Sequence, residues 1–465
     1  MNKILFFLVL FLFAFIPLYP KFPLFNVSGT FVAVRIEDIL IAATLGAWAI
    51  YLVISNQLRS YLKDKLNQAM LLFFFIGAVS LFCAIFLTHS VTPHIGILHL
   101  LRRVEYMMLL PVIVTVVKTK KQLISILIVL ALVVMAVDGY ALGQQFLDWP
   151  VISTTNSEFS KGLILRLTPG ARVSSTFAGH YDLAAFLAMA IVVMTAVFFA
   201  LKKRFKILVL LVAIPSVMIL IITAARQSFV AAFAGIIFAL ILSKKKKYLL
   251  FLFICVAIIL IYPSQLRERL ISTITVNIFN QGQRYEGRTE DQQIRSRLNI
   301  PTLAIKTSST SAQTSTFASP SGTIATDITP GEPIDTTELG VYRSFQIRLN
   351  IEWPRAIRAF IKNPLLGTGY SSLDIATDND FLRSLGEVGF LGTAALGLVL
   401  IEVGRRIYSL LQSQSKLIKY TGAGIFSMMI TFLINGLFID VLEASKVATL
   451  FWMTLGLGLA AVKFK

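Results

Sequence analysis

The feature that most constrains the fold is a series of apolar runs, most about 20 residues long, separated by polar connections. A run of this length is long enough to cross the hydrocarbon core of a bilayer as an α-helix. Only 14% of the residues are charged, whereas a soluble domain has about a quarter. The sequence therefore predicts an all-α polytopic membrane protein.

The apolar runs predict about twelve transmembrane helices. The first is interpreted as a retained helix and not a cleaved signal, because Pro17, Pro20 and Pro23 stand where a small-residue cleavage site would be needed. The predicted spans are residues 3–19, 33–54, 68–88, 97–117, 121–143, 178–200, 206–223, 227–243, 247–262, 384–403, 418–438 and 446–463.

Lysine and arginine residues cluster in every second connection, as in residues 202–206 and 244–247. Cytoplasmic loops carry such an excess of basic residues, so both chain ends are predicted to be cytoplasmic. The protein is then expected in the cytoplasmic (inner) membrane. The clusters also account for the formal net charge of +19 without a nucleic-acid partner.

The predicted organisation has three parts: transmembrane helices 1–9 in residues 1–262, a large extracytoplasmic loop at 263–383, and transmembrane helices 10–12 at 384–465. Within the loop, residues 307–340 are rich in Ser, Thr, Pro and Gly. This composition cannot bury a core and predicts disorder. Residues 342–383 are predicted to be helical and to carry the function.

Arginines supply the first candidate site residues. Arg226 interrupts an apolar stretch, where a charge is either functional or reaches the membrane surface at a hairpin tip. Arg348, Glu352 and Arg355 share a helical face. This face is either a surface ion-pair ladder or an anion site, because guanidinium groups match phosphate oxygens well. Pro354 is expected to kink this helix or to open a second one.

Two further places could carry chemistry. Asp378 precedes an apolar helix, so it is either the helix N-cap or a general base at the membrane edge. Arg102 and Arg103 lie at the outer end of the fourth span, against the charge rule. They either hold an anionic lipid headgroup or pair with Glu105.

Common cofactor motifs are missing from the sequence. It contains no phosphate-binding glycine-rich loop, no dinucleotide fingerprint, no zinc motif and no Gly-x-Ser-x-Gly element. The outer histidines have no metal-ligand spacing and are interpreted as interfacial polar residues; they are His89, His94, His99 and His180. We therefore expect no metal, no cofactor and no nucleotide.

Several blocks of the sequence resemble the O-antigen ligase and O-antigen polymerase family of bacterial membrane glycosyltransferases. The resemblance covers nearly the whole chain except residues 263–340. The blocks are VAVRIEDILIAATL (32–45), LLRRVEYMMLLPV (100–112), RVSSTFAGHYDLAAFLAM (172–189), TAARQSFVAAFAG (223–235), RLNIEWPRAIRAFIKNPLLGTGYSS (348–372), DNDFLRSLGEVGFLG (378–392) and INGLFIDVLEASKVATLFWMTLGL (434–457).

The resemblance implies a metal-independent transferase. Its donor would be an oligosaccharide on a polyprenyl diphosphate in the membrane, and its acceptor a glycan, a lipid or a protein. Arg226 and Arg348 match the family's arginines and, with Asp378, would be catalytic. The residues expected to bind the diphosphate or headgroup are Arg226, Arg348, Arg355, Arg102 and Arg103, and further candidates are Arg343, His180 and Asn379.

The sequence departs from the family at one position. The family's ligases have His followed by Asn where this chain has Asp378 and Asn379. Nearby arginines are expected to lower the pKa of Asp378 and weaken it as a base. The departure favours a polymerase or a divergent transferase over a ligase, and an inactive member stays open. A transporter or flippase of lipid-linked glycan is the alternative from another class.

Overall fold

The computed structural model describes residues 2–30, 33–152, 164–167, 171–275, 325–326, 337–373 and 376–465. The fold is almost entirely helical, with one two-stranded parallel pair between β1 (Leu165–Arg166) and β2 (Ala325–Thr326). Most of the segment 307–340, for which the sequence predicts disorder, lies outside the described residues.

Every predicted span overlaps one α-helix. The helices along the bundle are α1 (Asn2–Leu18), α2 (Ile36–Ile54), α4 (Lys65–Phe86), α5 (Pro93–Val116), α6 (Lys120–Phe146), α7 (His180–Phe198), α8 (Lys203–Ile222), α9 (Arg226–Leu242), α10 (Leu249–Ile261), α15 (Asp380–Tyr408), α16 (Lys416–Asn435) and α17 (Ser445–Ala461). The others are α3 (Leu58–Lys63), α11 (Gln265–Thr275), α13 (Thr337–Ile347) and α14 (Trp353–Lys362).

The long apolar helices make this a multi-pass membrane protein. Among the described residues, 8 helices are long and apolar enough to cross a membrane, and the helices α1 and α9 are apolar but shorter. The segment that ends in α10 continues into α11 after a bend of 90°. Helix α5 spans 24 residues, but the charged residues Arg102, Arg103 and Glu105 interrupt its apolar sequence.

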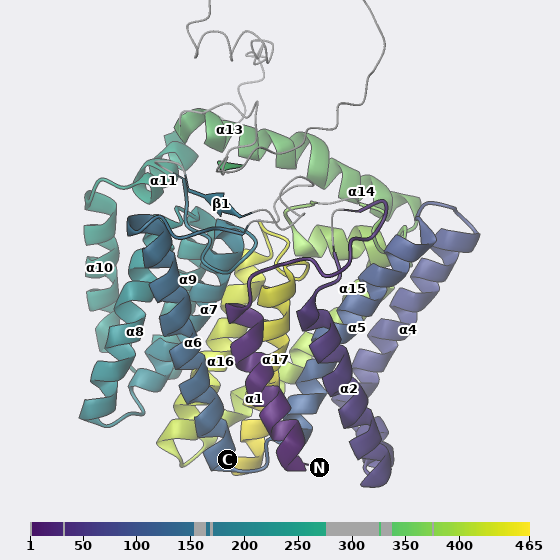
Figure 1. Cartoon of the computed structure of the whole chain (residues 1–465), viewed down its shortest axis with the longest axis horizontal. Helices are drawn as coiled ribbons and strands as arrows, with labels where there is room; N and C mark the ends of the chain where they lie inside the picture. The colour runs from purple at the N-terminus through teal and green to yellow at the C-terminus, as the bar shows by residue number, and fades with distance from the viewer. Residues whose placement is uncertain are drawn as a thin grey trace, which may run out of the picture.

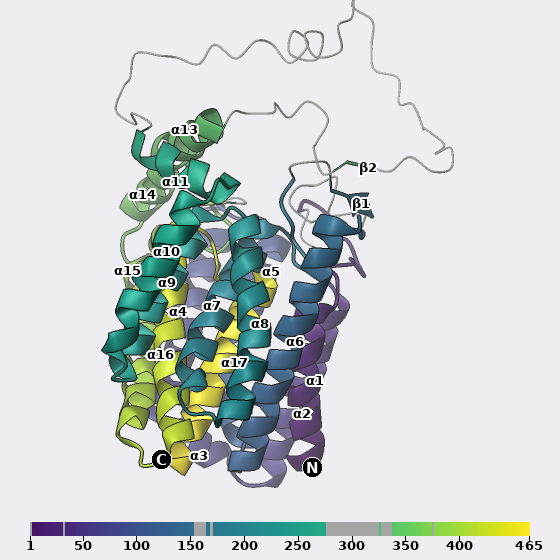
Figure 2. The same cartoon turned by 90° about the vertical axis from the view of Figure 1, so that its left-hand side faces the viewer.

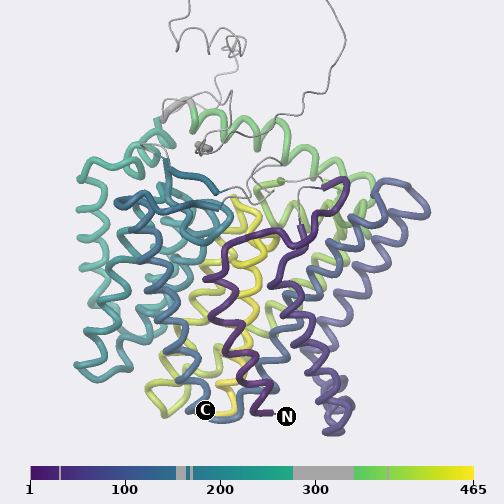
Figure 3. Tube along the Cα trace, in the orientation of Figure 1, coloured from purple at the N-terminus to yellow at the C-terminus, as the bar shows by residue number. Residues whose placement is uncertain are grey.

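The helices run side by side in a bundle, with both chain termini at one end (Figure 1). Helices α11, α13 and α14 lie at the opposite end, which we call the loop end (Figure 2). The Cα trace shows that α13 and α14 run across the bundle and not along it (Figure 3). Helix α17 lies at the centre, and all 17 of its residues are buried.

Lys446 joins three segments at the loop end of α17. It is 0% exposed, and its ammonium group donates to the carbonyl oxygens of Tyr19 at 2.5 Å and Thr176 at 2.7 Å. A longer bond of 3.4 Å reaches Pro17. A buried ammonium group needs such partners, because burial without them is costly. Lys446 therefore connects the end of α1 and the segment before α7 to α17.

A short π-helical segment, Arg348–Glu352, separates α13 from α14. Pro354 lies in the first turn of α14, where its missing N–H group is tolerated. Just before it, the amide of Trp353 donates to the carbonyl oxygen of Arg348, five residues back. Single-turn π segments of this kind are frequent at functional sites. The expectation that Pro354 opens a second helix is confirmed.

Helix α15 is broken at Gly389, whose φ of +66° is not helical. The turn at residues 363–369 passes through the break, so that the amide of Phe390 donates to the carbonyl oxygen of Pro364 at 2.8 Å. The next amide, of Leu391, donates to Leu365 at 3.1 Å. The turn therefore supplies acceptors to the first amides of the long apolar half of α15.

The same turn also satisfies the carbonyl groups on the other side of the break. The amide of Thr368 donates to Gly386 and that of Gly369 to Glu387, both at 2.9 Å. At a helix break, freed backbone groups at membrane depth must find partners inside the protein. We call this crossing of residues 363–369 and 386–391 the clasp. Gly367 and Gly369 in this turn have φ values of +70° and +92°, in the left-handed region that favours glycine.

Candidate functional site

Arg348 points inward from the loop end. It is 4% exposed, and its guanidinium group lies 2.6 Å from the carboxylate of Asp378. The same group donates to Ser344 and, at 3.4 Å, to the carbonyl oxygen of Phe438. Glu352, on the same helical face, is also buried. The alternative of an ion-pair ladder on the protein surface is therefore wrong.

Asp378 is not the N-cap of α15. The side chain of Asn379 fills that role, because its Oδ1 atom accepts from the amides of Phe381 at 3.0 Å and Leu382 at 2.9 Å. Asp378 instead adopts a left-handed backbone with φ of +49° and turns its carboxylate to Arg348. Of the two roles that the sequence left open for Asp378, the structure removes the capping role.

Two carboxyl groups at this site hold their protons more tightly than usual. Burial raises the pKa of Asp378, and the neighbouring charge of Arg348 offsets this only in part. The arginines do lower the pKa of Asp378, as expected, but burial outweighs them and the net shift is upward. Burial and the negative charge of Asp378 raise the pKa of Glu352 to about 7. Sequence reasoning placed Glu352 on the right face but did not select it as a site residue.

Arg226 begins α9 after a turn in which Ala224 has a φ of +50°. It is 5% exposed. Its guanidinium group donates to the hydroxyl of Thr273 on α11 and lies 5.0 Å from the ring centre of Phe345 on α13. The turn predicted at Arg226 is confirmed. Phe345 is one helical turn before Arg348, so the structure brings the two predicted arginines together.

Two more arginines lie beside them. Arg226 interacts electrostatically with Arg172, Arg269 and Arg348. Arg172 is 2.8 Å from the Nε2 atom of His180 at the start of α7, and Arg269 lies buried on α11. We call Arg172, Arg226, Arg269 and Arg348 the arginine cluster. Arg172 stands in one of the blocks that carry the resemblance, but no sequence signal selected Arg269.

The other predicted residues fall into two groups. Arg355 lies near the arginine cluster, because it donates to the carbonyl oxygen of Ala376, two residues before Asp378, at 2.6 Å. Arg343 lies half-buried on α13. Arg102 and Arg103 are held elsewhere, on α5. Arg102 donates to Ala33 at 3.0 Å. Arg103 pairs with Glu443, so the alternative in which it pairs with Glu105 is wrong for Arg103.

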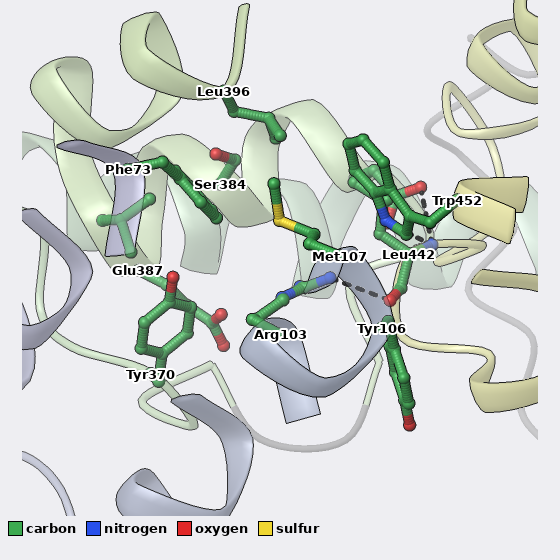
Figure 4. Close-up of a pocket in the computed structure, with 12 residues that line it drawn as sticks. Phe73, Arg103, Tyr106, Met107, Tyr370, Ser384, Glu387, Leu396, Leu442 and Trp452 are labelled. Carbon is green, nitrogen blue, oxygen red and sulfur yellow. Dashed lines mark hydrogen bonds between the residues drawn. The ribbon is translucent and has the colours of Figure 1, made fainter. Parts of the chain in front are cut away.

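A narrow cavity beneath the loop end contains a second set of charges. Arg103 and Glu387 point into it beside Tyr370, among apolar side chains such as Trp452 (Figure 4). Glu443, next to this cavity, is paired with Arg103. Burial alone would raise the pKa of Glu443, but the guanidinium groups around it outweigh burial and hold the pKa at about 2.

The described part of the chain offers no group of three or more His, Cys, Asp or Glu side chains that could hold a metal ion. Comparison with protein-family models finds none that matches the chain, and comparison with curated proteins finds no match.

Chemically, the arginine cluster concentrates positive charge in a buried place, with the carboxylate of Asp378 ion-paired to Arg348 at its edge. Guanidinium groups bind phosphate and carboxylate oxygens in pairs of parallel hydrogen bonds. Electrostatic interactions are stronger where water is excluded. The arrangement can therefore bind a multiply charged anion next to a carboxylate able to accept a proton.

Proposed function

We propose that this chain transfers or polymerises a glycan carried on a polyprenyl diphosphate at the outer face of the cytoplasmic membrane. The observation that supports this most is the arginine cluster, which lies beside Asp378 at the end of a membrane-spanning bundle. A lipid-linked diphosphate can bring its charged group to this end of the bundle while its chain stays in the bilayer. The resemblance in the sequence blocks points to the same activity.

The proposed topology has twelve spans and both termini in the cytoplasm. It rests on the basic clusters in alternate connections and on the overlap of every predicted span with a helix. With this orientation the loop end faces outward. The donor and the acceptor glycan would then meet at the loop end, on the side of the membrane opposite the cytoplasmic nucleotides.

The proposed chemistry is a displacement at the anomeric carbon of the donor sugar. Asp378 accepts the proton of an acceptor hydroxyl, whose oxygen forms the new bond to that carbon. The bond between the carbon and the diphosphate oxygen breaks, and its electron pair stays on the diphosphate. The arginine cluster stabilises this developing negative charge. The raised pKa of Asp378 makes it a better proton acceptor than an ordinary aspartate.

The test is a transfer assay in proteoliposomes with a lipid-linked oligosaccharide as donor. We expect Arg226→Lys, Arg348→Lys and Asp378→Asn each to lower kcat/KM on the order of 100-fold. The lysine variants lose the guanidinium group that stabilises the charge developing on the diphosphate, and the asparagine variant loses the proton acceptor. The matched control is Arg405→Ala, since Arg405 is 72% exposed and lies at the other end of α15. Wild-type rates in all three site variants would overturn the proposal.

The products of this assay separate the alternatives. Longer chains on the donor lipid indicate a polymerase, and transfer only to an added acceptor indicates a ligase. Movement of the donor across the bilayer without any new glycosidic bond indicates a flippase and contradicts the proposal.

A further inference from the structure

We propose that Asp440, held by Arg383, is a positioning residue that fixes the backbone on both sides of Asp378 so that the Asp378 carboxylate meets Arg348. This inference rests on the proposed function in one respect, the assignment of Asp378 as proton acceptor. The positioning itself can be measured without any transfer activity.

The carboxylate of Asp440 accepts hydrogen bonds from the backbone on either side of Asp378. Its Oδ2 atom accepts from the amide of Thr377 at 2.7 Å, and its Oδ1 atom accepts from the amide of Asn379 at 3.2 Å. Between these two amides, Asp378 has a φ of +49°. The left-handed region is unfavourable for a residue with a side chain, so the surrounding structure must hold it. The two hydrogen bonds to Asp440 stabilise this left-handed conformation of Asp378.

Arg383 holds Asp440 in turn. It is 1% exposed, and its Nη1 atom donates to Oδ2 of Asp440 at 2.8 Å. Its Nε atom is 3.4 Å from both Glu387 and Glu443. A guanidinium group fixed by three carboxylates has little freedom to rotate. Asp440 is thereby anchored to the first half of α15 and, through Glu443, to Arg103 on α5.

The segment around Asp440 is joined to residues 377–380 by further bonds. The amide of Asp380 donates to the carbonyl oxygen of Gly436 at 2.8 Å. The carboxylate of Asp380 accepts from the amide of Leu442 at 3.1 Å. These bonds hold the two segments together when Asp440 is changed. Substitution of Asp440 is therefore expected to release the local backbone of Asp378 and not to unfold the loop end.

The substitution Asp440→Asn isolates the effect. Asp440 accepts from three donors, and an asparagine offers one acceptor oxygen and one NH₂ group. The NH₂ group would face a donor and cannot accept from it, so at least one of the hydrogen bonds from the amides of Thr377 and Asn379 is lost. The shape of the side chain stays the same. Asp440→Glu keeps the charge and both acceptor oxygens, and serves as the conservative variant.

The activity-independent test uses Asp378→Cys in a protein whose two native cysteines, Cys83 and Cys255, are replaced by serine. Arg348 stays near position 378 through its bonds to Ser344 and Phe438. The positive charge of Arg348 should therefore make the introduced cysteine react faster with an anionic thiosulfonate than with a cationic one, and the ratio of these two labelling rates is the quantity measured. We expect Asp440→Asn to lower this rate ratio about fivefold, the size of one close charge interaction in water. Asp440→Glu should restore at least part of it.

The control is Glu402→Gln at the opposite end of α15, where Glu402 pairs with Arg406; it should leave the ratio unchanged. An unchanged ratio in folded Asp440→Asn overturns the inference. Loss of folding in both Asp440 variants also overturns it, because the residue would then be structural. In the transfer assay, Asp440→Asn should lower kcat with little change in the KM for the donor. A changed labelling ratio in a protein without transfer activity would leave the positioning standing and reject the proposed function.

Discussion

At the scale of single residues, the direction in which a side chain points decides its role at the loop end. Arg348 and Glu352 face the protein, whereas Ile347, Leu349 and Ile351 around them are exposed. This is the reverse of a soluble surface helix. The charged face points toward α15 and the 436–444 segment. Arg348 donates there to the carboxylate of Asp378, just before α15, and to the carbonyl oxygen of Phe438.

Glu352 gives a prediction about pH. Its pKa of about 7 in the folded protein lies above its ordinary value of 4.5, so the folded state binds this proton more tightly than the unfolded state. The contribution of Glu352 to stability is then lost as the pH rises from about 4.5 to about 7. We expect Glu352→Gln to raise stability by an amount on the order of 2 kcal/mol at pH 8 and to leave it unchanged at pH 4.

The measurement is thermal unfolding in detergent across this pH range. The control is Asn350→Ala, at an exposed position in the same segment. It removes no ionisable group, so its effect on stability should be the same at pH 4 and pH 8. Equal melting temperatures for wild type and Glu352→Gln at pH 8 would contradict the prediction.

Sequence patterns reach only part of this site. The resemblance selected Arg226 and Arg348, and helical spacing put Glu352 on the same face as Arg348. Asn379, and not Asp378, is the N-cap because Asp378 has a left-handed φ, which the neighbouring residues in the sequence do not specify. Arg269 and Asp440 were missed because their roles come from contacts with segments distant in the chain.

At the scale of elements, the clasp explains why two stretches of the chain are rich in glycine. Residues 363–369 and 386–391 cross so closely that a side-chain carbon on Gly389 would overlap the carbonyl of Leu365. A carbon on Gly367 would overlap the carbonyl of Glu387 in the same way. Gly367 and Gly389 therefore serve backbone packing in the clasp.

Gly389→Ala tests the clasp. The variant combines an unfavourable positive φ with a backbone overlap, so we expect destabilisation of roughly 2–4 kcal/mol. The control is Gly397→Ala on the same helix, since nothing lies within 4 Å of an added carbon there. That variant should be neutral or slightly stabilising. Thermal unfolding in one detergent compares the two, and equal melting temperatures would contradict the clasp.

At the scale of the whole molecule, the sequence was sufficient for the helices and insufficient for their packing. Apolar runs locate a span because the bilayer fixes its length, and every predicted span overlaps a helix. The predicted start of the tenth span, residue 384, falls inside α15, which begins at Asp380 and breaks at Gly389. Hydropathy does not register such a break, because the residues on either side of Gly389 are apolar.

Cysteine labelling in intact cells tests the proposed orientation. In the background without Cys83 and Cys255, Asn350→Cys at the loop end should react with a membrane-impermeant maleimide. Gln414→Cys, in the connection between α15 and α16, should react only after permeabilisation. Both side chains are exposed, so access to the reagent depends on the side of the membrane. The opposite labelling pattern would reverse the topology.

The clasp also bears on how the chain is made. The turn at 363–369 is synthesised before α15, so its carbonyl oxygens at Pro364 and Leu365 have left the ribosome when the amides of Phe390 and Leu391 emerge. We infer that the apolar half of α15 enters the bilayer with its first amides already partnered. A circularly permuted chain with the turn placed after α15 would lose that order of synthesis, and its yield in the membrane should fall.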